Sequence, residues 1–457
     1  MAHSEVRELS PRARTKVILA AILGSSLEWY DFYLYATASA LVFGKMFFPG
    51  HDPKTGVLLS FATFAVGFFV RPLGSIILAN IGDRIGRKPV LALTLIMMGV
   101  ASTGIGLIPS YESIGILAPI LLILMRVVQG LGAGAELAGV CVYCTETAPK
   151  GKRGLYGSFG FIGAYAGILL SSLAFSISSS LPEADFLSWG WRIPFLLSSV
   201  LVLIGWYVRV RLDETPVFTK AEKAAAASDS ERVPLMTLLR TQWPSLLTVV
   251  GITAGPFVGI YTYSTYAQTY LASLGVPKSF GSLALIVASG VAMVATPLFG
   301  AISDRVGRRP VVIAGSLITA LFAFPFFWLL EGGTQLTILI AMIVGQGIAL
   351  SLVFGPQGAL LSELFGTRMR LTGFSVGREL SSILFAGLSP LVAATLVSSA
   401  GGAIWPVSAY VAGASVVSLI VAVLFVPETA NRGLDDGVVA GSGATEPNLS
   451  NTVPLRQ

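Results

Sequence analysis

The most constraining feature of this chain is a succession of apolar runs of about 20 residues or more, the length at which a helix crosses a bilayer. Hydrophobic residues make up 54% of the 457 residues and charged residues only 12%, a balance that no soluble globular protein needs. We therefore predict an all-α integral membrane protein. Twelve transmembrane helices are expected, at residues 17–43, 58–80, 90–108, 116–146, 155–180, 190–211, 243–272, 279–302, 311–330, 335–362, 371–399 and 403–426.

Basic residues are distributed unevenly between the two sides of these expected helices. Of the 30 lysines and arginines, 23 fall on the side that holds both termini, four on the other side, and three within the runs. Because cytoplasmic loops carry the excess of positive charge, we expect both termini in the cytoplasm and a multi-pass protein of the cell (inner) membrane. Cys141 and Cys144 have no second Cys or His pair nearby, so we expect helix packing there and no metal site.

The second half of the chain repeats landmarks of the first. Residues 82–89 read GDRIGRKP and residues 303–310 read SDRVGRRP, while Gln129-Gly130 precedes Glu146 at the same spacing as Gln346-Gly347 precedes Glu363. This recurrence predicts two six-helix bundles of the same orientation. The expected parts are a cytoplasmic tail, the first bundle, a cytoplasmic central loop, the second bundle and a cytoplasmic disordered tail, at residues 1–16, 17–211, 212–242, 243–426 and 427–457.

Several motifs carry a resemblance to a known family. Both D-R-x-G-R-[RK] loops resemble the cytoplasmic signature of the major facilitator superfamily, and Arg126-x-x-Gln129-Gly130 resembles its fourth-helix motif. SLEWYDFYLY, FFVRPLGS, RVVQGLGAGAE and FLSWGWRIPF are similar to the metabolite:proton symporter family, most of all to its shikimate-transporter-like branch. The resemblance covers residues 17 to about 430 and implies two bundles around a cavity that opens alternately to either side.

The repeated basic loops are expected to form a cytoplasmic gate. An aspartate followed by basic residues can pair across helix ends with Glu146 or Glu363, in a latch made only in the outward-open state. Anchoring of the topology by positive charge is the alternative reading. The expected gate residues are Asp83, Arg84, Arg87, Glu146, Arg153, Asp304, Arg305, Arg308, Glu363 and Arg370.

Five ionisable residues of the first bundle are expected to form a cluster at membrane depth, where charge is costly and marks function by default. They are Glu28, Asp31, Arg71, Arg126 and Glu136. The repeat places the apolar Ile343 and Val353 at the positions that match Arg126 and Glu136, which argues against a role in the fold alone. A static salt-bridge network is the alternative.

Proton coupling, if present, must run through a carboxylate, because His3 and His51 lie outside the expected helices. Asp31 is the first choice and Glu136 the second, with Glu28 one helical turn from Asp31 on the same face. A carboxylate paired with arginine stays ionised, and it can accept a proton once the substrate has taken over the arginine.

Three buried arginines favour a small organic acid or a zwitterion as substrate, because a guanidinium binds a carboxylate through two hydrogen bonds. The substrate would be shikimate-like, another carboxylate, or betaine-like. The expected binding residues are Arg71, Arg126, Gln129, Tyr30, Tyr261, Tyr263, Arg378 and Glu379, with Tyr33 and Tyr266 as further cavity tyrosines.

Arg378 and Glu379 stand where shikimate-like relatives usually carry Tyr-Gln. Neighbouring helical residues point about 100° apart, so the two are not expected to neutralise each other. We expect Arg378 to add an anion contact that favours a more acidic or zwitterionic substrate. A pair between one of the two and another helix is the alternative.

Other functions are less consistent with the chain. A drug/proton antiporter of the same fold would be expected to present acids to a cationic substrate. A membrane sensor would need a sizeable soluble domain, and an enzyme would need a nucleophile motif or a metal set. We expect no cofactor besides the coupling proton (with sodium as the alternative ion), no nucleic-acid partner, and a monomer in the lipid bilayer.

Overall fold

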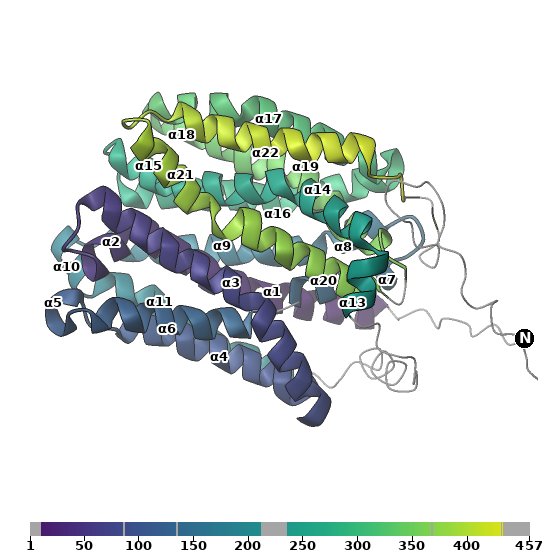
Figure 1. Cartoon of the computed structure of the whole chain (residues 1–457), viewed down its shortest axis with the longest axis horizontal. Coiled ribbons are helices and arrows are strands. Elements are labelled where there is room, and N and C mark those ends of the chain that lie inside the picture. The colour runs from purple at the N-terminus through teal and green to yellow at the C-terminus, as the bar shows by residue number, and fades with distance from the viewer. Residues whose placement is uncertain are drawn as a thin grey trace, which may run out of the picture.

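The computed structural model describes residues 11–85, 87–133, 136–211, 235–366, 369–430 and 432. These residues form two groups of long helices that lie side by side with their axes roughly along one direction (Figure 1). The N-terminal half, in purple and blue, occupies the lower part of the view, and the C-terminal half, from teal to yellow, occupies the upper part.

Each half is built from the predicted apolar runs. The helices of the N-terminal half are α1 (Pro11–Ala38), η1 (Ser39–Phe43), α2 (Gly44–Phe47), α3 (Pro53–Ile85), α4 (Arg87–Leu107), α5 (Tyr111–Ile114), α6 (Leu117–Gly132), α7 (Glu136–Glu146), α8 (Arg153–Gly157), α9 (Phe159–Ser178), α10 (Glu183–Ser188), η2 (Gly190–Arg192) and α11 (Ile193–Arg211). Those of the C-terminal half are α13 (Leu235–Thr241), α14 (Trp243–Tyr261), η3 (Thr262–Tyr266), α15 (Ala267–Ser273), α16 (Lys278–Val306), α17 (Arg308–Glu331), α18 (Gln335–Met342), η4 (Ile343–Ala349), α19 (Leu350–Glu363), α20 (Arg370–Ser381), η5 (Ser382–Gly387), α21 (Ser389–Ser399) and α22 (Trp405–Leu424).

Length and composition qualify nine helices of the described chain as membrane spans. Helices α1, α4 and α11 occupy the other three predicted positions. Large apolar side chains such as Val100, Val294 and Leu321 are 62–71% exposed, as expected of a surface that faces lipid rather than water.

Local structure differs from the predicted runs in three places. The run predicted at 116–146 is divided into α6 and α7, with residues 134–135 outside the described chain. Four spans contain a π-helical stretch (η1, η3, η4 and η5), and η1 and η3 occupy matching positions in the first span of each half. The central loop predicted at 212–242 ends in α13, and its residues 212–234 are not described.

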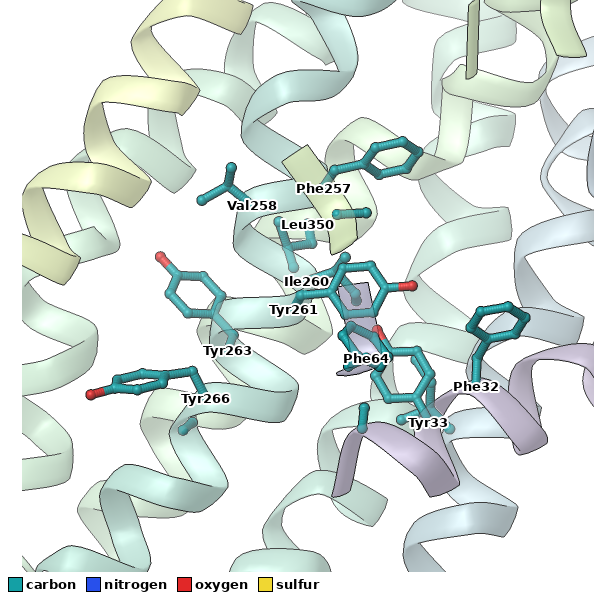
Figure 2. Close-up of a cluster of buried hydrophobic side chains, with 14 of the residues drawn as sticks. Phe32, Tyr33, Phe64, Phe257, Val258, Ile260, Tyr261, Tyr263, Tyr266 and Leu350 are labelled. Atoms are coloured by element: carbon teal, nitrogen blue, oxygen red, sulfur yellow. The ribbon is translucent and has the colours of Figure 1, made fainter. Parts of the chain in front are cut away.

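The two halves meet along two seams. Helix α9 packs against α16, and α3 packs against η5 and α21, so that α1 and α14 are held near the middle of the molecule. Rings from both halves fill this middle: Figure 2 shows Tyr261 of α14 reaching Tyr33 of α1, and their centroids lie 5.5 Å apart. This interface positions the site.

The two ends of the bundle differ in charge. We call the end that holds Arg153, Arg308 and Arg370 the basic end. At the opposite end, Glu183 of the N-terminal half lies 3.2 Å from Lys45 and 3.9 Å from Lys278 of the C-terminal half. The nearby ammonium groups lower the pKa of the Glu183 carboxyl group, first through the hydrogen bond from Lys45. One exposed ion pair, between Glu183 and Lys278, therefore joins the halves at this end.

Candidate functional site

Four buried charges form a continuous chain across the interface between the halves. Glu28 of α1 accepts a hydrogen bond of 2.5 Å from Arg71 Nη2 of α3. Arg71 Nε lies 3.8 Å from Glu379 Oε2 of α20, and Arg378 Nη1 donates to Glu379 Oε1 at 2.8 Å. All four residues are no more than 7% exposed. We call Glu28, Arg71, Glu379 and Arg378 the charge chain.

The charge chain corrects one expectation. Arg378 and Glu379 were expected not to neutralise each other, yet they form a direct ion pair. The long arginine side chain spans the angle between neighbouring positions on the helix. Glu379 also pairs with Arg71 of α3. The alternative expectation, a pair between one of the two residues and another helix, therefore holds for Glu379.

Arg126 lies apart from this chain, in a cage of aromatic rings. Its guanidinium carbon is 4.5–4.8 Å from the ring centroids of Phe32, Tyr35 and Phe64, distances typical of cation–π contacts. Its Nη1 donates to Gln129 Oε1 at 2.5 Å, and its Nε and Nη2 both donate to the Phe64 carbonyl oxygen. No carboxylate among the described residues forms an ion pair with it.

Gly67 makes room for this guanidinium. A Cβ atom on Gly67 would lie 2.4 Å from Arg126 Nε. Any larger residue at that position would therefore displace the arginine from its carbonyl and ring contacts.

Asp31 is connected to Arg126 only indirectly. Its carboxylate accepts a 2.6 Å hydrogen bond from Ser198 of α11 and lies beside the Ser102 hydroxyl group of α4. Ser102 in turn accepts a 3.0 Å hydrogen bond from Gln129 Nε2, and Gln129 binds Arg126. The route from Asp31 to Arg126 therefore passes through two neutral side chains.

The predicted five-residue cluster thus divides into two. Glu28 and Arg71 belong to the charge chain, while Asp31 and Arg126 belong to a polar network within the N-terminal half. Glu136 begins α7, but its side chain lies outside the described part of the structure. Glu28 and Asp31 still line one small cavity, with room for about one water molecule, between α1, α4 and α11.

A second cavity, with room for about one water molecule, lies between the two halves. Trp29, Phe161 and Tyr165 line it from the N-terminal half, and Phe257, Phe354 and Arg378 line it from the C-terminal half. Within the described chain, Trp29 Nε1 and Arg378 Nε have no hydrogen-bond partner. Buried donors of this kind are costly unless something accepts from them, so we call this space the central cavity and regard it as the candidate substrate site.

The expected cavity tyrosines face different directions. Tyr261 points toward the interface, where its ring packs against Phe64 and Phe68 as well as Tyr33 (Figure 2). Tyr263 and Tyr266 point to the other side of the same helix in Figure 2. The ring of Tyr263 stacks on that of Phe326, with 4.0 Å between the ring centroids.

Tyr30 points away from the interface as well. Its hydroxyl group donates to the Pro194 carbonyl oxygen, within the N-terminal half. Tyr30, Tyr261 and Tyr263 are not among the residues that line the central cavity, and their contact with the substrate stays a prediction.

At the basic end, two ion pairs cross between the halves in a symmetric way. Arg370 Nη1 lies 2.5 Å from Glu146 Oε1, and Arg153 Nη1 lies 3.8 Å from Glu363 Oε1. Each arginine thus pairs with the glutamate of the other half, at positions that the internal repeat relates to each other.

Asp304 reinforces this contact. Its carboxylate accepts hydrogen bonds from the backbone nitrogens of Gly154 and Leu155, at 2.8 and 3.0 Å, at the start of α8. Arg308, only 1% exposed, holds both Asp304 and Glu363, so it does more than anchor the topology in solvent. Arg305 is exposed, and the side chains of Asp83, Arg84 and Arg87 lie outside the described residues.

Glycines bring the two halves into backbone contact beside these ion pairs. A Cβ on Gly358 of α19 would lie 2.2 Å from the Gly157 carbonyl oxygen, and one on Gly154 would lie 2.3 Å from the Gly300 carbonyl oxygen. A side chain at Gly358 cannot be accommodated while this end is closed. The buried thiol of Cys141 lies at the same contact, 3.3 Å from the Gly358 Cβ position.

Replacing Gly358 with leucine is therefore expected to open the basic end. In a Cys144→Ser background, alkylation of Cys141 by a maleimide should accelerate about tenfold or more, since overpacking costs about 1–3 kcal/mol. Gly290→Leu is the matched control, because nothing lies within 4 Å of its Cβ position. Equal labelling rates in the two variants would contradict the role of Gly358 in closure.

Sequence reasoning missed the Arg71–Glu379 contact and most of the central cavity. The sequence could not identify Phe161, Phe257 and Phe354 as cavity residues. In an apolar run, a phenylalanine that lines a cavity cannot be distinguished from one that packs in the core. Of the lining residues, Arg378 was among the predicted binding residues, whereas Trp29, between the two acids of the first run, was not.

Comparisons with known proteins agree with this architecture. A family model described as "Sugar (and other) transporter" matches the chain twice, over residues 17–233 and 220–437. The inner membrane metabolite transport protein YhjE of Escherichia coli is 40% identical over 91% of this chain and 95% of its own length.

Two further relatives from Escherichia coli have named substrates. The shikimate transporter is 38% identical over 90% of this chain and 94% of its own length, and the proline/betaine transporter is 36% identical over 94% and 87%. Among solved structures, the D-xylose-proton symporter superposes with a TM-score of 0.70 at 20% identity, covering 91% of this chain and 98% of that one. This last likeness concerns the fold alone.

Proposed function

We propose, because the chain belongs to the sugar and other transporter family within the major facilitator superfamily, that it carries a small carboxylate or zwitterion inward together with a proton. The protein is a membrane transporter of two repeated six-helix bundles and not an enzyme. Its substrate class, its coupling ion and its direction of transport are the proposed parts.

One observation carries the proposed substrate class: aromatic side chains line the central cavity together with Arg378, and two donors on its lining residues, Trp29 Nε1 and Arg378 Nε, lack partners in the described chain. A carboxylate in this space would accept from the Arg378 guanidinium, and guanidinium–carboxylate hydrogen bonds are among the strongest in proteins. The aromatic walls suit an apolar ring or an onium group, which bind such surfaces by burial or by cation–π attraction. Proline and betaine, for which one relative is named, fit these two descriptions, and shikimate, for which another is named, carries its carboxylate on a hydroxylated ring.

We assign Asp31 as the carboxylate that takes the coupling proton. It is 4% exposed, faces a cavity within the N-terminal half, and is not neutralised by a direct ion pair with a described residue. Its site is separate from the central cavity, so proton and substrate would enter by different routes. We further propose that the basic end is cytoplasmic, as its excess of lysine and arginine favours.

The experiment is uptake into proteoliposomes of labelled shikimate, glycine betaine and proline, with and without an imposed pH gradient. D-xylose serves as the control that lacks a carboxylate. Accumulation of one of the three carboxylates that depends on the gradient is the expected result. Accumulation of xylose alone, or equal uptake in the absence of the gradient, would contradict the proposal.

Arg126 supports coupling rather than substrate anchoring in this scheme, because it does not line the central cavity and is linked to Asp31 through Gln129 and Ser102. Arg126→Lys keeps the charge but cannot bind both Gln129 and the Phe64 carbonyl group. We expect near-normal substrate affinity, with accumulation reduced about tenfold. This reduction corresponds to the loss of one charge-assisted hydrogen bond, which contributes roughly 1.5–3 kcal/mol. Binding and uptake measured on one preparation distinguish this from a loss of affinity.

A further inference from the structure

The charge chain is neutral as it stands. Arg71 and Arg378 contribute two positive charges, and Glu28 and Glu379 contribute two negative charges, all buried between α1, α3 and α20. A net charge at this depth is far more costly than a balanced set of ion pairs. Any ligand that alters this balance must therefore bring or recruit a compensating charge.

The geometry shows where an anion would alter it. Arg378 is the terminal member of the chain and the only one that lines the central cavity. One of its nitrogens, Nη1, is bound by Glu379, while Nε is without a partner in the described chain. A carboxylate bound at Arg378 would compete directly with Glu379 for the same guanidinium.

The described surroundings of Glu379 contain no other cation that could replace Arg378. On its own helix and on η5 its oxygens face Arg378 and the Ser382 hydroxyl group, which donates at 3.2 Å. From α3 it faces Arg71, already bound to Glu28. Tyr261 of α14 lies near Arg71 and Arg378, and the Cys141 thiol of α7 lies near Arg378. The Glu136 side chain, on α7, is outside the described residues.

We propose that Glu379 is a second proton acceptor, which takes up one proton whenever an anionic substrate binds Arg378. The substrate carboxylate accepts the guanidinium hydrogen bonds, the Arg378–Glu379 bond breaks, and a proton from the aqueous side forms an O–H bond on Glu379. Negative charge brought by the substrate is thereby cancelled within the chain. A zwitterion brings no net charge and recruits no proton here.

This assignment rests on the proposed function in taking the central cavity as the substrate site. It differs from the role given to Asp31, which takes the coupling proton whatever the substrate. The number of protons bound therefore depends on the charge of the substrate, and Glu379 makes that adjustment.

Removing the Arg378 charge imitates the effect of a bound anion, which allows a test without substrate. Infrared difference spectroscopy of the purified protein reports protonated carboxyl groups through their C=O absorption. At neutral pH, Arg378→Gln is expected to show one protonated carboxyl group more than the unaltered protein. The double variant Arg378→Gln, Glu379→Gln should lose it again, and Arg378→Lys, which keeps the charge, should not show it.

Either of two results would overturn the proposal. One is an Arg378→Gln spectrum without an added acid band, and the other is a band that persists in the double variant, which would place the proton on Glu28. If Arg378→Gln does not fold, proton uptake by the unaltered protein decides instead. In weakly buffered solution, shikimate binding should take up one proton more than glycine betaine binding, and Glu379→Gln should abolish that difference.

The binding and proton-uptake measurements distinguish failure of this proposal from failure of the proposed function. Absence of saturable binding for shikimate and for glycine betaine would count against the central cavity as a substrate site, while the infrared result still decides the role of Glu379. Equal proton uptake for both ligands in the unaltered protein would overturn the role of Glu379 alone.

Discussion

Asp31→Asn is expected to abolish accumulation of substrate driven by a pH gradient while leaving exchange of substrate across the membrane intact. Asparagine has nearly the same shape and can still accept the Ser198 hydrogen bond, but it cannot bind and release a proton. Without that step, the downhill movement of protons has no means of driving the substrate uphill. Uptake by proteoliposomes with an imposed gradient, compared with counterflow without one, measures the two activities separately.

Ser198→Ala is the matched control for this variant. It removes the 2.6 Å hydrogen bond from Asp31 but keeps the carboxyl group, so accumulation should persist. If Asp31→Asn accumulates substrate as well as the unaltered protein does, the proton site lies elsewhere.

Arg71→Met is expected to cause the largest loss of stability in the molecule. Arg71 is the only member of the charge chain that contacts both glutamates, and its loss leaves the chain with one uncompensated negative charge. Breaking a buried pair by removing one partner costs about 3–5 kcal/mol. A proton on either carboxylate can replace the missing cation, so the deficit should shrink as the pH falls. Thermal unfolding in detergent at several pH values measures it.

Restoring the charge balance should restore most of the lost stability. Adding Glu28→Gln to Arg71→Met leaves Glu379 paired with Arg378 and the chain neutral, so most of the stability should return. Arg192→Met provides the comparison, because Arg192 donates to the carbonyl oxygens of Gly106 and Ile108 and packs on the Trp191 ring but forms no ion pair in the described chain. A double variant no more stable than Arg71→Met would show that packing of Arg71 against Phe32 and Phe68, rather than charge, carries the effect.

The fold was predictable because a bilayer imposes a length on every apolar run and the chain repeats its landmarks. The same repeat identified the residues of the basic end, because it matches Glu146 with Glu363 and Arg153 with Arg370 at one common offset. The repeat could not predict which arginine pairs with which glutamate. The ion pairs cross from one half to the other, so they depend on how the halves dock.

The site was less predictable because it depends on the direction of single side chains. Tyr261 and Tyr263 are about 200° apart on a helix, so both could not face one cavity, and only Tyr261 faces the interface. Arg378 and Glu379 were expected to point apart and yet form an ion pair. The angle between their Cβ atoms does not determine where the guanidinium lies, because it stands at the end of a long side chain. Contacts between distant segments, such as Arg71 with Glu379, leave no local pattern to read.

The balance of buried charge also has an electrical consequence. Six described charges at membrane depth sum to zero, namely Glu28, Asp31, Glu379, Arg71, Arg126 and Arg378. These six described charges would therefore move no net charge across the membrane potential when the empty carrier reorients. With the proposed proton sites, a zwitterion would travel with one proton on Asp31 and an anion with a second proton on Glu379, so the loaded carrier would bear one positive charge in both cases. Each 100 mV of potential, negative inside, then contributes about 2.3 kcal/mol to uptake of either substrate.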